Sequence, residues 1–320
     1  MHGNLKGALT ALLAFGIFAT HDVLVKVLGG TYSPVQLVFF SVLLSFPLMT
    51  VMLVADAKPG TLQPVHPWWV ALRTGAAVMT GLSAFYAFSV LPLAQVYSIL
   101  FASPLIITVL AIPVLGERVR LRRWAAVIVG LIGVVVVLRP GSTALSLGHL
   151  AALLAAFGSA TASIVVRRIG ADERPVVLLL YPMVANVVLM GAALYWVYEP
   201  MPVEHLGLLF LLSMMGWTAG WLIVSAYNAG EAAIVAPMQY SQILWASAYG
   251  LIFFDESIDL WTGIGAGIII TSGLYIVLRE SRTGASGTRP VLRTRSRPET
   301  STSFRIGPVL RLRGKHPDAD

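Results

Sequence analysis

The feature that most constrains this chain is a run without Lys, Arg, Asp or Glu that extends from residue 74 to residue 116. A helix rises 1.5 Å per residue, so about 20 residues cross the ~30 Å hydrocarbon core of a bilayer. The run is therefore too long for one membrane-spanning helix. Because proline interrupts helical hydrogen bonding, Leu91–Pro92 is the natural break between two helices.

The rest of the chain has the same apolar character, since 57% of its residues are hydrophobic and 12% are charged. Soluble domains carry roughly 25% charged residues, so lipid must solvate part of this surface. Backbone groups in lipid must bond to one another within a segment, which predicts helices. Ten apolar segments can be drawn: 7–28, 34–54, 68–90, 93–115, 122–138, 147–167, 176–197, 206–228, 232–254 and 258–278.

The chain is internally doubled. Residues 7–34 match residues 148–175 at eleven of 28 positions, and Glu117 aligns with Glu256. Each half has five predicted helices, an odd number, so the second half must enter the membrane from the opposite side. The predicted fold class is an all-α integral membrane protein with ten transmembrane helices in two inverted five-helix repeats. This arrangement is typical of secondary transporters.

Domain boundaries and orientation follow from the repeat and the charges. The repeats are predicted at 1–140 and 141–279, followed by a disordered basic cytoplasmic tail at 280–320. Residues 279–320 hold 10 of the 22 Lys and Arg residues, so the net charge of +7 lies mostly in the tail and does not indicate nucleic-acid binding. Positive charge favours the cytoplasmic side, which predicts that both termini are cytoplasmic. The first apolar run lacks a small-residue cleavage site and is interpreted as a retained helix.

Two ionisable residues of the first helix, His21 and Asp22, are unusual at their depth in the bilayer. An ionised Asp near the membrane centre costs roughly 2.5–3.5 kcal/mol, so such residues often mark functional cavities. Lys26 is four residues beyond Asp22, and simple neutralisation of Asp22 by Lys26 is the alternative. Lys26 has a cationic counterpart in the second repeat, Arg167, whereas His21 and Asp22 have none. We therefore expect Lys26 to be architectural and Asp22 to contact the substrate or a coupling proton.

The fourth and ninth segments combine polar side chains with helix-breaking prolines, Pro104 and Pro237. Paired interruptions in corresponding segments of two repeats point to a binding site near the membrane midplane. The hydroxyl, amide and aromatic groups there could bond a zwitterion or a heteroaromatic ring, or hold a cation. Packing against lipid or other helices is the alternative for each aromatic, and extension to the lipid headgroups is the alternative for Arg73. The candidate substrate-binding residues are His21, Asp22, Arg73, Tyr86, Tyr97, Ser98, Ser103, Trp217, Gln239, Tyr240 and Gln242.

Several function classes find no support. No Walker loop is present, the histidines lack metal-ligand spacing, and the chain has no cysteine. We expect neither a cofactor nor a metal site. An embedded enzyme would need an acid, a base and a nucleophile clustered at one depth, and the sequence offers only His21 beside Asp22.

The doubled five-helix pattern, the AQVY and AIVA starts of the fourth and ninth segments, and the Gly–Glu turn at residue 116 resemble the EamA family of the drug/metabolite transporter superfamily. The resemblance implies cytoplasmic termini and a substrate cavity between the repeats. It also implies substrates such as amino acids, S-adenosylmethionine or riboflavin. HDVLVKVLGG at residues 21–30 is similar to members described as S-adenosylmethionine transporters. At Phe40–Ser41 the chain departs from many relatives, which have an aromatic residue followed by Arg.

These observations predict a secondary transporter in the bacterial inner membrane that moves an amino acid or a related small metabolite by alternating access. An uptake transporter for S-adenosylmethionine or a riboflavin-like cofactor is one alternative, and a non-transporting membrane scaffold or sensor is another. The expected partners are a small-molecule substrate and the lipid bilayer. The residues leave open the direction of transport, coupling to protons and the oligomeric state.

Overall fold

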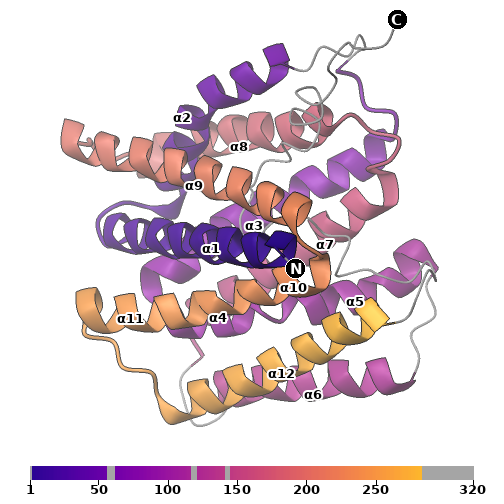
Figure 1. Ribbon diagram of the computed structural model, residues 1–320. Coiled ribbons are helices and arrows are strands. Elements are labelled where there is room, and N and C mark those ends of the chain that lie inside the picture. Colours follow the sequence, from indigo (N-terminus) through magenta and orange to yellow (C-terminus); the bar gives the residue numbers. More distant parts are fainter. Residues whose placement is uncertain (1, 56–61, 117–120, 141–144, 283–320) are drawn as a thin grey trace, which may run out of the picture.

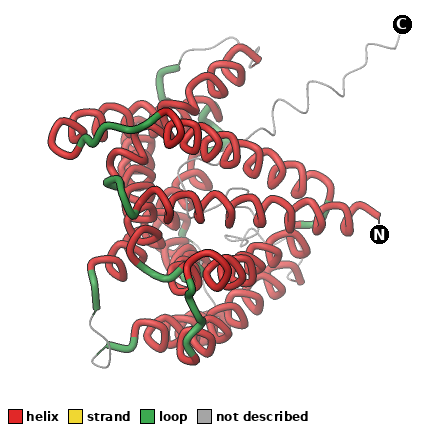
Figure 2. The backbone as a smooth tube through the Cα atoms, turned by 90° about the vertical axis from the view of Figure 1, so that its left-hand side faces the viewer, coloured by secondary structure: helices red, strands yellow, loops and turns green. Residues whose placement is uncertain are grey.

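The computed structural model describes residues 2–55, 62–116, 121–140 and 145–282, and these residues form helices and short connections without a β-strand (Figures 1 and 2). The tail predicted at 280–320 lies, beyond Arg282, outside the described residues, as does Glu117. The first six helices are α1 (His2–Gly29), α2 (Pro34–Ala55), α3 (Pro67–Val90), α4 (Leu93–Leu100), α5 (Ser103–Leu115) and α6 (Leu121–Leu138). They are followed by α7 (Leu147–Ile169), α8 (Pro175–Val197), α9 (Val203–Ala229), α10 (Ala232–Val235), the 3₁₀ helix η1 (Ala236–Ser241), α11 (Gln242–Phe254) and α12 (Leu260–Arg282).

Two of the predicted segments are interrupted. The segment 93–115 divides into α4 and α5 at Phe101 and Ala102, just before Pro104. The segment 232–254 divides into α10, η1 and α11, and Pro237 lies in the 3₁₀ part. Proline lacks the N–H that a continuous helix needs and clashes with the preceding turn, which accounts for the position of both interruptions.

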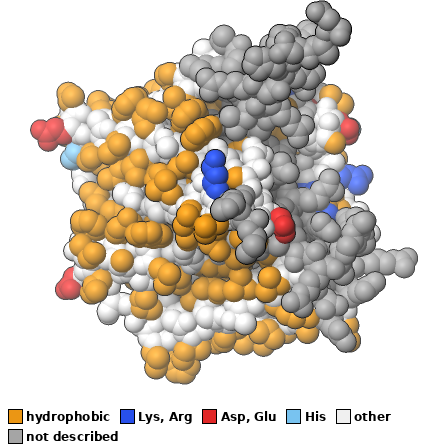
Figure 3. Space-filling model, in the orientation of Figure 1, with side chains coloured by type: hydrophobic (Ala, Val, Ile, Leu, Met, Phe, Trp, Pro, Cys, Tyr) orange, Lys and Arg blue, Asp and Glu red, His pale blue; other side chains and the backbone are white. Residues whose placement is uncertain are grey.

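Six helices in the described part of the chain are long and apolar enough to cross a membrane, with α4 and α5 counted together. They are Asn4–Gly29, Leu93–Leu115, Leu147–Ile169, Pro175–Val197, Val203–Ala229 and Leu260–Leu278. Pro34–Thr50 and Trp124–Leu138 are apolar but shorter. The protein is thus a multi-pass membrane protein. Its surface fits lipid, since large apolar side chains such as Leu5, Leu9 and Leu13 are exposed, and Figure 3 shows apolar side chains over most of the visible described face.

The helices pair in a pattern that relates the two halves. The most extensive contacts join α1 to α9, α3 to α7, α2 to α8, and α6 to α12. Exchanging the halves of the sequence converts the first of these pairs into the second and leaves the third and fourth unchanged. Small residues permit the close approach that membrane helices use: a Cβ atom on Gly158 of α7 would lie 2.5 Å from Thr80 Oγ1 and 2.9 Å from the Ala76 carbonyl oxygen, both on α3.

Candidate functional site

The centre of the candidate site is Asp22 on α1. The side chain is completely buried, and its neighbour His21 is 1% exposed. The His21 Nδ1 and Asp22 Oδ1 atoms are 2.7 Å apart. This contact gives the buried carboxylate a partner within its own helix, but a carboxylate has capacity for further hydrogen bonds at its second oxygen.

The second oxygen of Asp22 is bound from another helix. The hydroxyl of Tyr97, in the last turn of α4, donates a hydrogen bond to Asp22 Oδ2. Gln242, the first residue of α11, donates from Nε2 to the Tyr97 hydroxyl over 3.4 Å. His21, Asp22, Tyr97 and Gln242 therefore form one hydrogen-bonded group, the polar network. It joins α1 and α4 of the first half to α11 of the second half.

Aromatic rings surround the polar network. The Tyr97 ring has its centroid 5.3 Å from that of Phe88 and 6.1 Å from that of Phe101, and the Phe85 ring lies 6.2 Å from the His21 ring at an angle of 82°. Phe101 in turn meets the Tyr240 ring edge-on at 5.0 Å. Such an apolar shell lowers the local dielectric constant, which strengthens hydrogen bonds to Asp22 and makes any unsatisfied polar group costly.

The helix interruptions position two members of the network. Tyr97 lies one turn before the α4–α5 break, and Gln242 directly follows η1. Interrupted helices place side chains and free backbone groups at mid-depth in many membrane transporters. The prolines of the two segments thus bring polar groups from both halves to the same buried place.

The network has unused hydrogen-bonding capacity. In the described part of the chain, His21 Nε2 and Gln242 Oε1 are buried without a hydrogen-bond partner. An ionised Asp22 can only accept, so His21 Nδ1 and the Tyr97 hydroxyl must both donate to it. Tyr97 then accepts from the Gln242 amide, and the buried Gln242 oxygen keeps its capacity to accept a hydrogen bond. In the neutral His21 ring the Nε2 atom is likewise an acceptor.

The sequence offered Asp22 as an alternative partner of Lys26, and the structure pairs Lys26 with Glu256. Its ammonium lies 2.8 Å from Glu256 Oε1 and donates to the Leu91 carbonyl oxygen over 2.6 Å. The Lys26 side chain extends toward the Gly29 end of α1, where the α11–α12 connection supplies Glu256. Asp22 has hydrogen-bonding contacts with Tyr97 and His21.

The other predicted residues are spread over the fold. The Arg73 guanidinium donates to the Leu178 carbonyl oxygen on α8. Ser103 is bound to Ser159 and Ala156 of α7, at 2.9 and 3.2 Å, so its contacts join α5 to α7. Ser98 is buried beside Tyr97 in α4 and donates to the Ala94 carbonyl oxygen over 2.7 Å. The half-buried residues of the predicted set are Arg73, Tyr86, Trp217 and Gln239.

Sequence reasoning missed Phe88, Phe101 and Glu256 as neighbours of these groups. Phe101 follows Tyr97 by four residues, so a helical-face analysis of the uncharged run could have found it. Glu256 was visible only as an acid in a predicted link, and no local pattern connects it to Lys26.

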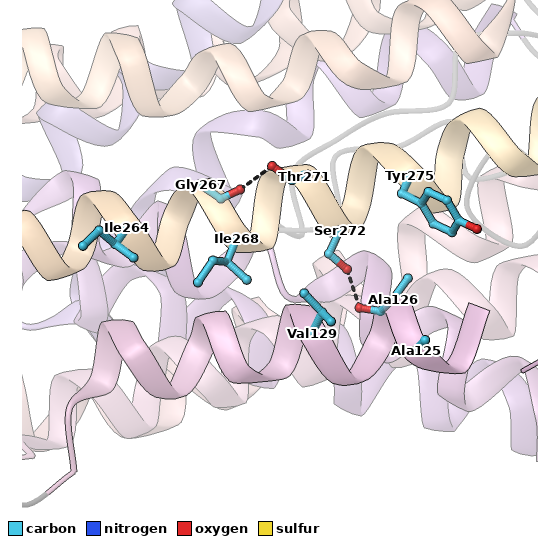
Figure 4. A pocket seen from close by; sticks show the side chains of 9 residues that line it. All are labelled: Ala125, Ala126, Val129, Ile264, Gly267, Ile268, Thr271, Ser272 and Tyr275. Atoms are coloured by element: carbon cyan, nitrogen blue, oxygen red, sulfur yellow. Dashed lines mark hydrogen bonds between the residues drawn. The ribbon is translucent and has the colours of Figure 1, made fainter. Parts of the chain in front are cut away.

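A separate groove lies between α6 and α12, with a volume of about 650 Å³ (Figure 4). Its lining is mostly apolar, and its hydroxyl groups are those of Thr271, Ser272 and Tyr275. Ser272 donates across the groove to the Ala126 carbonyl oxygen, as the dashed line in Figure 4 shows. None of the predicted substrate-binding residues lines it.

The fold and the network define a class of protein: a multi-pass membrane protein built from a doubled helical unit, with a buried polar group where the halves meet. The chain belongs to the EamA-like transporter family, whose model matches residues 5–139 and again residues 146–279. The two matches confirm the family resemblance and the doubling, and they place the chain in a family of membrane transporters.

Several curated relatives have names that state a cargo. An S-adenosylmethionine uptake transporter of Rickettsia bellii is 29% identical over 85% of this chain and 93% of its own length. A pseudopaline exporter of Pseudomonas aeruginosa is 26% identical over 83% and 94% of the two chains. A riboflavin transporter of Rhizobium johnstonii is 27% identical over 68% and 72%. A solved protein crystal structure also matches 88% of this chain and 99% of its own at 19% identity, with a TM-score of 0.55, which supports the fold alone.

Proposed function

We propose that this protein is a secondary transporter that carries an amino acid or a related small metabolite across the bacterial inner membrane by alternating access. The observation that carries the proposal is the polar network, which is buried at the junction of α1, α4 and α11 and so receives groups from both halves. Relative movement of the halves would open this place to one side of the membrane and then to the other.

The proposed topology has ten spans as two inverted repeats, with both termini in the cytoplasm. The exchange-related helix pairs support a two-fold relationship between the halves. The links at the Gly29 end of α1 are acidic, because they contain Glu199, Glu204 and Asp255, which fits the outer side under the positive-inside rule. In Figure 3 the acidic side chains at the left edge lie at this end, away from the visible Lys and Arg side chains.

The hydrogen-bond inventory favours a substrate that donates. The His21 Nδ1 and Tyr97 hydroxyl donors are already used on Asp22, whereas His21 Nε2 and Gln242 Oε1 remain without partners in the described structure. A buried acceptor without a donor costs about 1–3 kcal/mol, so a ligand that supplies N–H groups gains that amount back. An ammonium group also suits a carboxylate surrounded by aromatic rings. Amino acids and other amine-bearing metabolites meet these requirements.

S-adenosylmethionine and riboflavin-like cofactors form a second candidate class, favoured by the names of the relatives. S-adenosylmethionine carries both an amine and a positive charge, so it also fits the inventory above. The relatives include uptake and export proteins, and the direction of transport is therefore a separate question. A non-transporting scaffold or sensor is the alternative of another class, and it predicts no flux.

The proposal is tested with the purified protein in sealed vesicles. A thermal-shift screen against amino acids, S-adenosylmethionine and flavins first identifies a ligand, because binding raises the unfolding temperature. Uptake of that ligand is then measured for the parent and for Asp22→Asn. We expect transport by the variant to fall at least about 10-fold, equivalent to ~1.4 kcal/mol. Asp255→Asn is the matched control, since it makes the same change at an exposed residue. Flux at the parent rate in Asp22→Asn would remove Asp22 from the mechanism, and absence of flux in all proteins would favour the scaffold.

A further inference from the structure

A single ion pair ties together the ends of the three helices that carry the polar network. Lys26 lies near the end of α1, four residues beyond Asp22. Leu93 begins α4, four residues before Tyr97, and its N–H donates to Glu256 Oε2 over 3.1 Å. Glu256 follows α11, whose first residue is Gln242. Figure 1 shows the α1–α2 and α11–α12 connections on the same side of the molecule.

Glu256 is held firmly on α11. Its N–H donates to the Gly250 carbonyl oxygen over 2.9 Å, after Asp255 turns the chain with a φ of 54°. Gly250 leaves room for the carboxylate, because a Cβ atom there would lie 3.1 Å from Glu256 Oε2. The two carboxylate oxygens thus reach Lys26 and the first N–H of α4 at the same time, and movement of α11 away from both α1 and α4 must break both bonds.

The ion pair is also placed to open. The Lys26 and Glu256 side chains are 11% and 19% exposed, so the pair is at the edge of the molecule and not in its centre. Water solvates the Lys26 ammonium and the Glu256 carboxylate well when they are apart. The free energy lost when this water is removed offsets much of the attraction between the two charges. A contact of this kind can form and dissociate with a small net change in free energy, as a reversible closure needs.

Tyr32 and Gln36 make contacts at the same end of the protein that join other helices. Tyr32 bonds His205 over 2.6 Å, and Gln36 bonds the backbone of Glu199 at 2.6 and 2.8 Å. They connect the α1–α2 region to the α8–α9 region, which contributes no residue to the polar network. Tyr32 therefore offers a control at the same end of the molecule.

We propose that the Lys26–Glu256 pair is the gate that closes the Gly29 end of the transport path in this structure. The inference rests on the alternating-access function proposed above. When the pair dissociates, the end of α11 separates from α1 and α4, and the polar network becomes accessible from that side. Under the proposed orientation, this side is the outer one.

The test uses accessibility and needs no known substrate. Because the chain has no cysteine, Ser98→Cys introduces a single thiol beside Tyr97. A membrane-impermeant maleimide is applied to intact cells and, separately, to inside-out membrane vesicles. We expect slow labelling in the Ser98→Cys parent and at least about 10-fold faster labelling when Lys26→Gln or Glu256→Gln is added, since each removes one charge of the pair. The exchange Lys26→Glu with Glu256→Lys should slow labelling again, and Tyr32→Phe should not change it.

A packing control separates opening from unfolding. Ser159→Cys places the thiol at a buried position in α7, bound to Ser103 and outside the network. It should stay protected in the Gln variants. Equal labelling at both positions, or parent-like labelling of Ser98→Cys in the Gln variants, would overturn the gate. If labelling accelerates only in inside-out vesicles, the gate stands and the proposed orientation is wrong. If the protein transports the ligand found by the thermal-shift screen but Ser98→Cys is not labelled faster in the Gln variants, the transport function stands and the gate is rejected.

Discussion

Tyr97 of α4 and Asp22 of α1, 75 residues apart in the sequence, meet through a buried hydrogen bond in which the phenol donates to the carboxylate. Both side chains are inaccessible to solvent. The phenol also accepts from Gln242, so it connects the two halves of the protein at the level of single atoms.

Replacing the Tyr97 phenol removes the hydroxyl group that joins Asp22 to Gln242. Tyr97→Phe keeps the ring but leaves Asp22 Oδ2 and Gln242 Nε2 without their shared partner. A buried charged group that loses a hydrogen bond costs about 1–3 kcal/mol or more. We therefore expect a lower unfolding temperature and transport reduced roughly 5- to 100-fold, measured by thermal unfolding and vesicle uptake. Tyr275→Phe, at an exposed tyrosine in the groove between α6 and α12, is the matched control, and unchanged uptake in Tyr97→Phe would contradict the proposed role.

The interruption of the fourth span should matter for movement more than for stability. Pro104→Ala restores an N–H near the α4–α5 break, where Phe101 and Ala102 separate the helices. Alanine favours a continuous helix by up to ~3 kcal/mol over proline in a helix interior. We expect an unfolding temperature equal to or above that of the parent, together with slower transport. Pro113→Ala, at an exposed position inside α5, is the comparison. Faster or equal transport in Pro104→Ala would show that the break is not a working hinge.

Much of this architecture could be predicted from the sequence. Apolar segments of about 20 residues, a repeat offset and two prolines are local signals, and they anticipated the all-helical fold, the doubling and the two interruptions. Of the ten predicted spans, six are long and apolar enough to cross a membrane in the described part of the chain. The family is confirmed because its model matches both halves of the chain. Which side chains from distant parts of the sequence form ion pairs could not be predicted from such local signals. Lys26 has an acid four residues before it, yet it pairs with Glu256, 230 positions away, because the packing of α1 on α11 decides which carboxylate is within reach.

The candidate site shows the same division between local and long-range information. Asp22 was recognisable alone, since an acid in an apolar helix is costly. That Tyr97, and not Ser103, faces it depends on the direction in which α4 ends. Ser103 begins α5 beyond the break and is turned toward α7. The α4–α5 break thus directs Tyr97 toward α1 and Ser103 toward α7. Helical periodicity does not continue across the break, so it could not predict this difference.

The link between Arg139 and Asp259 should make stability depend on acid pH. Burial acts to raise the pKa of Asp259, but hydrogen bonds from Thr262 and the Trp261 N–H, with the charge of Arg139 2.5 Å away, hold it below its usual value. A lowered pKa in the folded state contributes stability above the unfolded pKa of about 3.9, and this contribution is lost as pH falls through the folded value. Because the group is partly exposed, the effect should be at most about 1 kcal/mol.

This dependence is measured as the difference in unfolding temperature between pH 6 and pH 3 in detergent. Asp259→Asn should show a smaller decrease than the parent, since it has no carboxylate to protonate. Asp255→Asn, which removes an exposed acid four residues earlier, should behave like the parent. A parent-like decrease in Asp259→Asn would mean that other groups produce the acid sensitivity.

The α3–α7 contact should tolerate no side chain at Gly158. A Cβ atom there would approach the Ala76 carbonyl oxygen to 2.9 Å, and backbone cannot move aside as a flexible side chain can. Overpacking of this kind costs about 1–3 kcal/mol, so Gly158→Ala should lower the unfolding temperature. Gly75→Ala, on α3, meets no atom within 4 Å and should be neutral or stabilising by up to ~1 kcal/mol, because alanine is the better helix former. If both substitutions had the same effect, close approach of α3 and α7 would not be what fixes their position, and the pairing that relates the two halves would need another cause.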